Sequence, residues 1–112
     1  MLNRSLILGL LLTTSLLSAQ SAFTPSPPID IPLVLSGTFA ELRGNHFHGG
    51  IDIKTQGRSG LKITAVADGY VSRVAVSPYG YGNALYLRHP EGYTTVYGHL
   101  NAFYPELEAW VE

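Results

Sequence analysis

Short β-type runs separated by turn residues fill most of the second half of this 112-residue chain. The runs are rich in Val, Ile, Thr and Tyr, and they cover residues 62–66, 70–76, 83–89 and 93–99. Asp68-Gly69, the loop Ser77–Gly82 and the turn Pro90–Gly92 stand between them. Glycine allows a positive φ and proline fixes φ, so these segments favour tight turns. The alternation predicts a mainly antiparallel β-meander, with room for a helix only from Pro105 onward.

The N-terminus has the layout of a secretory leader. Arg4 precedes the apolar run Leu6–Leu17, which is shorter than the roughly 20 residues that a membrane-spanning helix needs. Ala19 and Ser21 put small residues at positions −3 and −1 of a cut after Ser21. We therefore expect residues 1–21 to be a signal peptide that is cleaved, rather than kept as an anchor, and the mature protein to be exported.

Composition limits what the remaining chain can be. Residues 22–36 hold four prolines and are expected to form a linker or an edge segment, followed by one domain at 37–112. The chain has no cysteine, so it carries neither a disulfide framework nor a lipidated cysteine. Its formal net charge of −1 argues against a nucleic-acid or anionic-lipid partner. We expect the mature protein to be a monomer that does not contact the membrane after the leader is cleaved.

The stretch Asn45–Lys54, "NHFHGGIDIK", concentrates ligand-type side chains in a chain that is only 13% charged. His48 and Asp52 are four residues apart, but Gly49-Gly50 makes a helix costly, and a straight strand would hold their Cα atoms roughly 13 Å apart. A bend at the glycines lets both side chains meet one ion, which predicts half of a zinc site. The alternative is a simple hydrogen-bonded His–Asp pair.

Two further histidines bear on this choice. His99 ends the run 93–99, where it would share one face with Thr95 and Tyr97 by the period of two. It is a candidate functional residue, or else a strand-end histidine satisfied by a loop carbonyl. His89, directly before Pro90, is expected to be structural or exposed.

The segments "HFHGGIDI", "AVADGYVSRV" and "YGNALYLRHPEGYTTVYGHL", in this order and spacing, resemble the lysostaphin-type zinc endopeptidases, which cut peptide bonds of bacterial peptidoglycan. The likeness runs from about Gly37 to Leu100. It implies an open, mainly antiparallel β fold (the duplicated hybrid motif), a location in the periplasm, cell envelope or exterior of a bacterium, and a peptidoglycan peptide as partner.

Carried over by position, the resemblance makes His48 and Asp52 ligands of one Zn²⁺, and His99 the catalytic histidine that faces the metal without binding it. Arg43 and Asn45 are expected near the groove, without assigned roles. The family's third ligand lies in a His-x-His element well downstream, and no such element follows His99 in this sequence. His89 would break the order of the ligands, and His46 is expected on the wrong side of the bend. We expect a truncated domain or a natural fragment, whose two-ligand site binds zinc weakly.

Two other classes of protein stay open. A non-catalytic relative of the same fold would bind peptidoglycan or activate another hydrolase, although such relatives typically lose the ligands that are kept here. A lipoyl- or biotinyl-type carrier would use the hairpin "KITAVADGYVSRVAV". That class needs a lysine at the hairpin tip, where this chain has Asp68-Gly69.

Overall fold

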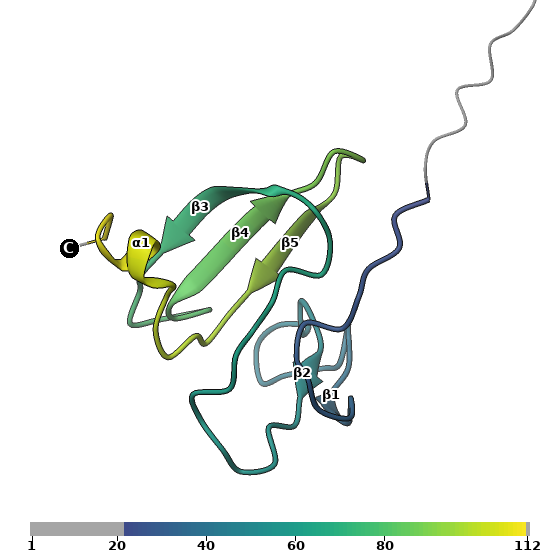
Figure 1. Cartoon of the computed structure of the whole chain (residues 1–112). Coiled ribbons are helices and arrows are strands. Elements are labelled where there is room, and N and C mark those ends of the chain that lie inside the picture. Colours follow the sequence, from purple (N-terminus) through teal and green to yellow (C-terminus); the bar gives the residue numbers. More distant parts are fainter. Residues whose placement is uncertain (1–21, 112) are drawn as a thin grey trace, which may run out of the picture.

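The computed structural model of the chain describes residues 22–111, and the predicted leader lies outside them. Two antiparallel sheets and one short helix form in this range (Figure 1). The first sheet pairs β1 (Leu35–Gly37) with β2 (Asp52–Ile53), and the second has the order β3 (Tyr70–Ala75), β4 (Ala84–Arg88), β5 (Thr94–Tyr97). The mainly β, antiparallel prediction is confirmed, and the sheets of the described residues do not close into a barrel.

The three-stranded sheet is the predicted meander. β3 pairs with β4 from Tyr70↔Arg88 to Ala75↔Ala84, and β4 pairs with β5 through four consecutive residue pairs. The turn after β4 closes as expected: the His89 N–H donates to the Tyr93 carbonyl at 2.9 Å, and Gly92 has a φ of 90° that glycine adopts without strain. Turn chemistry therefore sets where these strands begin and end.

The expected strand at Lys62–Val66 is wrong. This segment makes one isolated bridge, Ile29↔Ile63, to the proline-rich segment, instead of a ladder with β3. The Thr64 N–H donates to the Pro28 carbonyl at 2.8 Å. Prolines have no N–H to donate, so pairing along this segment cannot continue as a strand. The hairpin on which the carrier alternative depended is therefore absent from the described residues.

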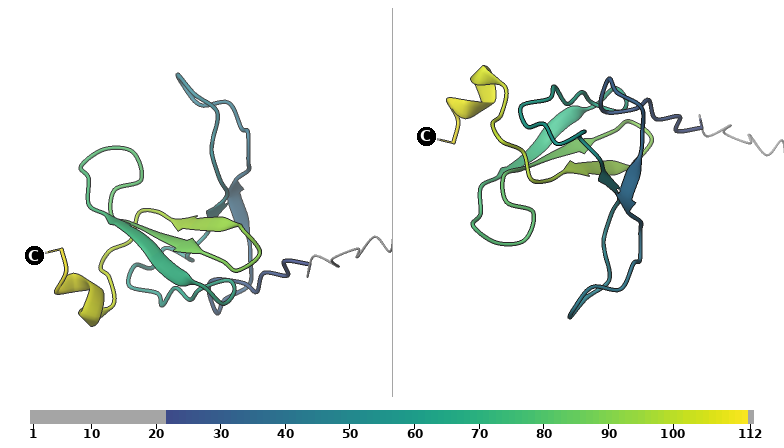
Figure 2. Two further views of the ribbon diagram at one scale, coloured as in Figure 1. Left: turned by 90° about the horizontal axis from the view of Figure 1, so that it is seen from above. Right: turned by 90° about the horizontal axis from the view of Figure 1, so that it is seen from below.

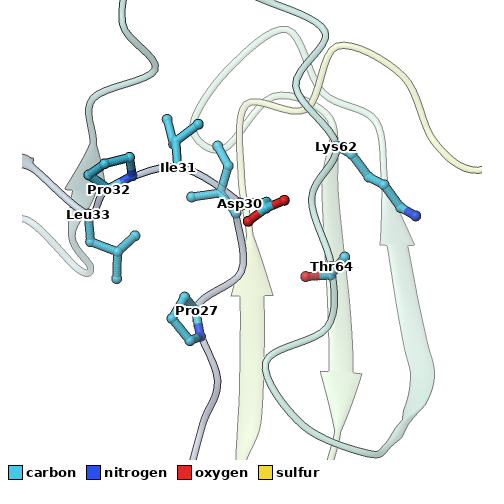
Figure 3. Close-up of a pocket in the computed structure, with 8 residues that line it drawn as sticks. Pro27, Asp30, Ile31, Pro32, Leu33, Lys62 and Thr64 are labelled. Atoms are coloured by element: carbon cyan, nitrogen blue, oxygen red, sulfur yellow. The ribbon is translucent and has the colours of Figure 1, made fainter.

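The proline-rich segment follows the outside of the 62–64 backbone as an edge (Figure 3). A hollow of about 610 Å³ lies between the two. Its lining residues are Pro27, Ile29, Asp30, Ile31, Pro32, Leu33, Lys62 and Thr64. Ile29 is buried there, which fixes residues 26–33 against the rest of the described chain. The domain boundary at residues 36 and 37 stays a prediction.

A buried polar chain ties the sheet to the loop before it. His89 is only 2% exposed, and its Nδ1 lies 2.8 Å from the Asp68 carbonyl, while Nε2 lies 2.9 Å from the Thr95 hydroxyl. Thr95 and Tyr97 share this face, and their hydroxyl oxygens are 3.1 Å apart. The Val66 N–H donates to the Tyr97 hydroxyl at 3.0 Å. His89 is thus structural, one of the two roles expected for it.

Helix α1 (Pro105–Glu108) occupies the predicted position. Pro105 fits the first turn because that turn has no use for its missing N–H, and Glu106 and Glu108 suit the positive N-terminal end of the helix dipole. Among residues 22–111, no helix has the length and apolar character needed to cross a membrane.

The polar chain at His89 carries an unusual share of the stability, because the buried apolar side chains of residues 22–111 are only Ile29, Ala84 and Leu87. We predict that His89→Leu, which removes both hydrogen bonds at similar volume, lowers the free energy of unfolding by about 1–3 kcal/mol. Arg88→Gln, one residue earlier and exposed, serves as the control and should change it by less than about 0.5 kcal/mol. Denaturant unfolding measures both, and equal effects would contradict a structural role for His89.

Candidate metal centre

Between β1 and β2 the chain forms a narrow loop that projects away from the three-stranded sheet (Figure 2). Backbone hydrogen bonds hold its two arms together: the His48 N–H donates to the Glu41 carbonyl and the Ala40 N–H to the His48 carbonyl, both at 2.8 Å. The Arg43 N–H donates to the His46 carbonyl at 2.8 Å and closes the tip. This ladder returns His48 toward the sheet edge just before β2 begins.

The chain bends between His48 and Asp52, as the sequence predicted, and the two side chains meet. Nε2 of His48 lies 3.2 Å from Oδ1 of Asp52. The bend does not use a positive φ at either glycine. Gly49 instead lies close to Tyr81, because a Cβ there would lie 2.9 Å from the Tyr81 hydroxyl oxygen and would make the tyrosine shift. The convergence was predicted correctly, and the reason for the glycine was different.

Both ring nitrogens of His48 have polar neighbours. Nδ1 lies 3.0 Å from the Thr38 carbonyl and 3.3 Å from Nη2 of Arg43. A carbonyl only accepts and a guanidinium only donates, so Nδ1 cannot serve both. A proton on Nδ1 serves the shorter, carbonyl contact and leaves Nε2 available to a metal ion, whereas the 3.2 Å contact of Nε2 with Oδ1 of Asp52 needs a proton on Nε2 when no metal is bound. Nδ1 facing a backbone carbonyl is the ring orientation that a metal-binding histidine takes.

The pair suits a zinc ion in distance and donor type. Two ligands at tetrahedral zinc, each about 2.0–2.2 Å from the ion, are roughly 3.4 Å apart, close to the observed separation of Nε2 and Oδ1. Imidazole nitrogen and carboxylate oxygen are both usual zinc ligands. Within residues 22–111, no group of three or more His, Cys, Asp or Glu side chains is placed to hold a metal ion. The described residues therefore bring together two candidate ligands, His48 and Asp52.

Arg43 forms the strongest charge contact of the site. Its Nη2 donates to Oδ2 of Asp52 at 2.8 Å and lies 3.3 Å from Oε2 of Glu41. The hydrogen bond from Arg43 holds the pKa of the Asp52 carboxyl below its ordinary value of 3.8. Partial desolvation of the carboxyl opposes this lowering of its pKa. Asp52 is therefore an anion at neutral pH, as a metal ligand must be.

His99 reaches the same groove from the other sheet. β5 ends at Tyr97, and His99 has a φ of 56°, so it leaves the strand face on which the alternation had placed it. The backbone N–H of His99 donates to the Tyr81 carbonyl at 2.7 Å. The groove, about 690 Å³, is lined by Arg43, His46, Phe47, His48, Gly49, Asp52, Gly80, Tyr81 and His99. All three predicted site residues thus line one hollow.

Other residues are placed differently from the prediction. His46, expected on the wrong side of the bend, lines the groove, and its Nδ1 lies 2.6 Å from Oδ1 of Asn45 rather than near the pair. Sequence reasoning gave Arg43 no role and did not single out Tyr81 within its glycine-rich loop. Tyr81 connects the two sheets through His99 and Gly49, yet its sequence signal is only a tyrosine in a glycine-rich loop. Arg43 stands nine residues before Asp52, a spacing that has no meaning until the loop folds back.

The site brings together an imidazole, an anionic carboxylate and a second histidine that lines the same open groove. The model of Peptidase family M23 matches residues 46–112, which contain His48, Asp52 and His99. The chain belongs to this family, and its class is therefore that of a peptidase acting on a peptide substrate. Comparison with curated proteins and with solved structures gave no significant match.

We predict that Arg43→Gln raises the pKa of Asp52 in the metal-free protein toward its ordinary value, because the hydrogen bond from Arg43 is the main cause of the shift. A carboxyl group whose pKa is lower in the folded than in the unfolded protein stabilises the fold at pH values above the unfolded-state pKa. This stabilisation is lost as the pH falls through the folded-state pKa. The extra folding stability that the wild type has over Arg43→Gln at neutral pH should therefore vanish in acid, below pH 3.8. NMR titration of the Asp52 carboxyl measures the shift, with Arg58→Gln as the control. An unchanged titration in Arg43→Gln would contradict the assignment.

Proposed function

We propose that this chain carries the zinc site of an exported metalloendopeptidase that hydrolyses peptide bonds of bacterial peptidoglycan. The observation that supports it best is the 3.2 Å approach of His48 Nε2 to Asp52 Oδ1 in a groove shared with His99. Membership of a peptidase family supports the reaction class. Zinc and peptidoglycan rest on the resemblance of the three motif blocks to the lysostaphin-type enzymes.

In this proposal His48 binds zinc through Nε2 and Asp52 binds through Oδ1. When bound, zinc would polarise the scissile carbonyl and bring the pKa of a water molecule to about 7. The resemblance implies a third protein ligand from a downstream His-x-His element, which this sequence does not contain after His99. The two-ligand site of this chain alone should hold zinc weakly.

Residues around the proposed zinc site would assist catalysis, hold the His48 ring and bind the substrate. His99 lies across the groove from the pair, where it can hold the developing negative charge of the substrate oxygen or pass a proton to the leaving amine. The Thr38 carbonyl keeps the His48 ring in one orientation through Nδ1. Phe47, Gly80 and Tyr81 line an open groove that suits an extended peptide with small side chains.

The place of action follows from the proposed substrate. Peptidoglycan lies outside the cytoplasmic membrane, so the enzyme must be exported to the periplasm, cell envelope or exterior, and the leader-like residues 1–21 fit this requirement. The net charge of −1 fits a peptide partner rather than a nucleic acid. We propose that it acts as a monomer.

We predict that the complete gene product holds about one zinc ion per chain and releases peptide from purified peptidoglycan. His48→Ala and Asp52→Asn should lose both zinc and hydrolysis, since each removes a ligand. His99→Ala should keep zinc and lose hydrolysis by about 10²–10⁴-fold, the usual contribution of a proton-transfer group. Asp30→Asn, an exposed carboxylate outside the groove, is the matched control for Asp52→Asn. Metal analysis and release of soluble fragments measure the two properties.

The same assay decides between the enzyme and the non-catalytic alternative. A product that binds peptidoglycan without zinc and without turnover would be a binding or activating domain, and the hydrolase proposal would fail. Loss of zinc in His99→Ala would instead make His99 a ligand and contradict the role given to it.

A further inference from the structure

The carboxylate of Asp52 is divided between two partners. Oδ1 lies 3.2 Å from Nε2 of His48, and Oδ2 accepts a hydrogen bond from Nη2 of Arg43 at 2.8 Å. The guanidinium lies at Oδ2 and leaves Oδ1 as the oxygen that faces Nε2 of His48. The contact with Arg43 therefore orients Asp52 so that Oδ1 faces the candidate metal position.

The backbone beside the Arg43–Asp52 ion pair has a glycine, Gly37, where a side chain would collide with the pair. Gly37 is opposite Asp52 in the β1–β2 pair and is buried. A Cβ at Gly37 would clash with Oδ2 of Asp52 and would lie 2.7 Å from Nη2 of Arg43. Gly37 has no positive φ, so its backbone alone does not require glycine. The missing side chain makes room for the contact between Arg43 and Asp52.

Arg43 is itself held in place from two sides. Its Nη2 also lies 3.3 Å from Oε2 of Glu41, and the backbone N–H of Arg43 closes the loop tip on the His46 carbonyl. The side chain is about 39% exposed, so the ion pairs add little to global stability. Their effect is local orientation, which is what hydrogen bonds to metal ligands typically provide.

We propose that Arg43 is a positioning residue that holds Asp52 as a one-oxygen metal ligand, and that Gly37 is required because it leaves space for this contact. The inference rests on the proposed zinc site. The proposal also predicts the sign of the change in zinc affinity. Loss of Arg43 weakens zinc binding even though it removes a positive charge from the site. The fixed carboxylate outweighs the repulsion between guanidinium and zinc.

The test measures the zinc dissociation constant of the complete gene product by competition with a chelator of known affinity. Arg43→Gln should weaken zinc binding by about 10–100-fold, the range typical of partners that orient metal ligands. Arg43→Lys, which keeps the charge and one donor, should recover part of the loss. Arg58→Gln is the control, because the Arg58 guanidinium hydrogen-bonds to Gln56 in its own loop and the variant should keep wild-type affinity.

Gly37→Ala separates positioning from general damage. It leaves Arg43 intact but blocks its contact, so it should weaken zinc binding to a similar degree, and the double variant with Arg43→Gln should be no worse than either single one. Thermal unfolding of the zinc-free variants should stay near that of the wild type. Additive losses would overturn the shared mechanism.

The two proposals fail in different ways. If the wild type binds zinc, His48→Ala abolishes binding, and Arg43→Gln binds as the wild type does, the role of Arg43 is refuted and the zinc site stands. If the wild type binds no zinc, the proposed function itself fails. If the zinc-free variants lose their folded state, Arg43 supports the fold and the positioning role is overturned.

Discussion

The carboxylate of Asp52 connects the parts of this structure on which function depends. Its Oδ1 faces His48 across the glycine bend, and its Oδ2 takes the charge of Arg43 from the projecting loop. A side chain at Gly37 would displace Oδ2 of Asp52 and the Arg43 guanidinium, and one at Gly49 would displace the Tyr81 hydroxyl. The short β1–β2 pair places Gly37 opposite Asp52, where the missing side chain leaves room for the contact with Arg43.

The three-stranded sheet contributes the other side of the groove. Its turns place Tyr81 and His99 next to each other, joined by a backbone hydrogen bond of 2.7 Å, and Tyr81 in turn approaches Gly49 beside His48. His99 adopts a φ of 56°, which is uncommon for a residue with a side chain and often marks a functional position. The sheet thus holds a histidine against the candidate metal ligands without any of its strands entering the site.

Much of this arrangement could be predicted from the sequence because it depends on local chemistry. Turn dipeptides and β-branched runs located β3, β4 and β5, and the spacing around Gly49-Gly50 allowed His48 and Asp52 to converge at a bend. What failed depended on distant partners. Residues 62–66 have the composition of a strand, yet they face a segment whose prolines cannot donate, and His46 reaches the groove only because the loop tip turns at Arg43. The Arg43–Asp52 contact joins residues that no periodicity relates.

The central claim is that His48 offers Nε2 to a metal beside Asp52 while Nδ1 faces the Thr38 carbonyl. Nitrogen-15 NMR of the histidine side chains, recorded before and after addition of zinc, tests it directly. The account predicts that zinc takes the place of a proton on Nε2 of His48 and shifts that resonance, while Nδ1 carries a proton in the zinc-bound protein. A His48 signal that zinc leaves unmoved, or zinc bound through Nδ1, would contradict it.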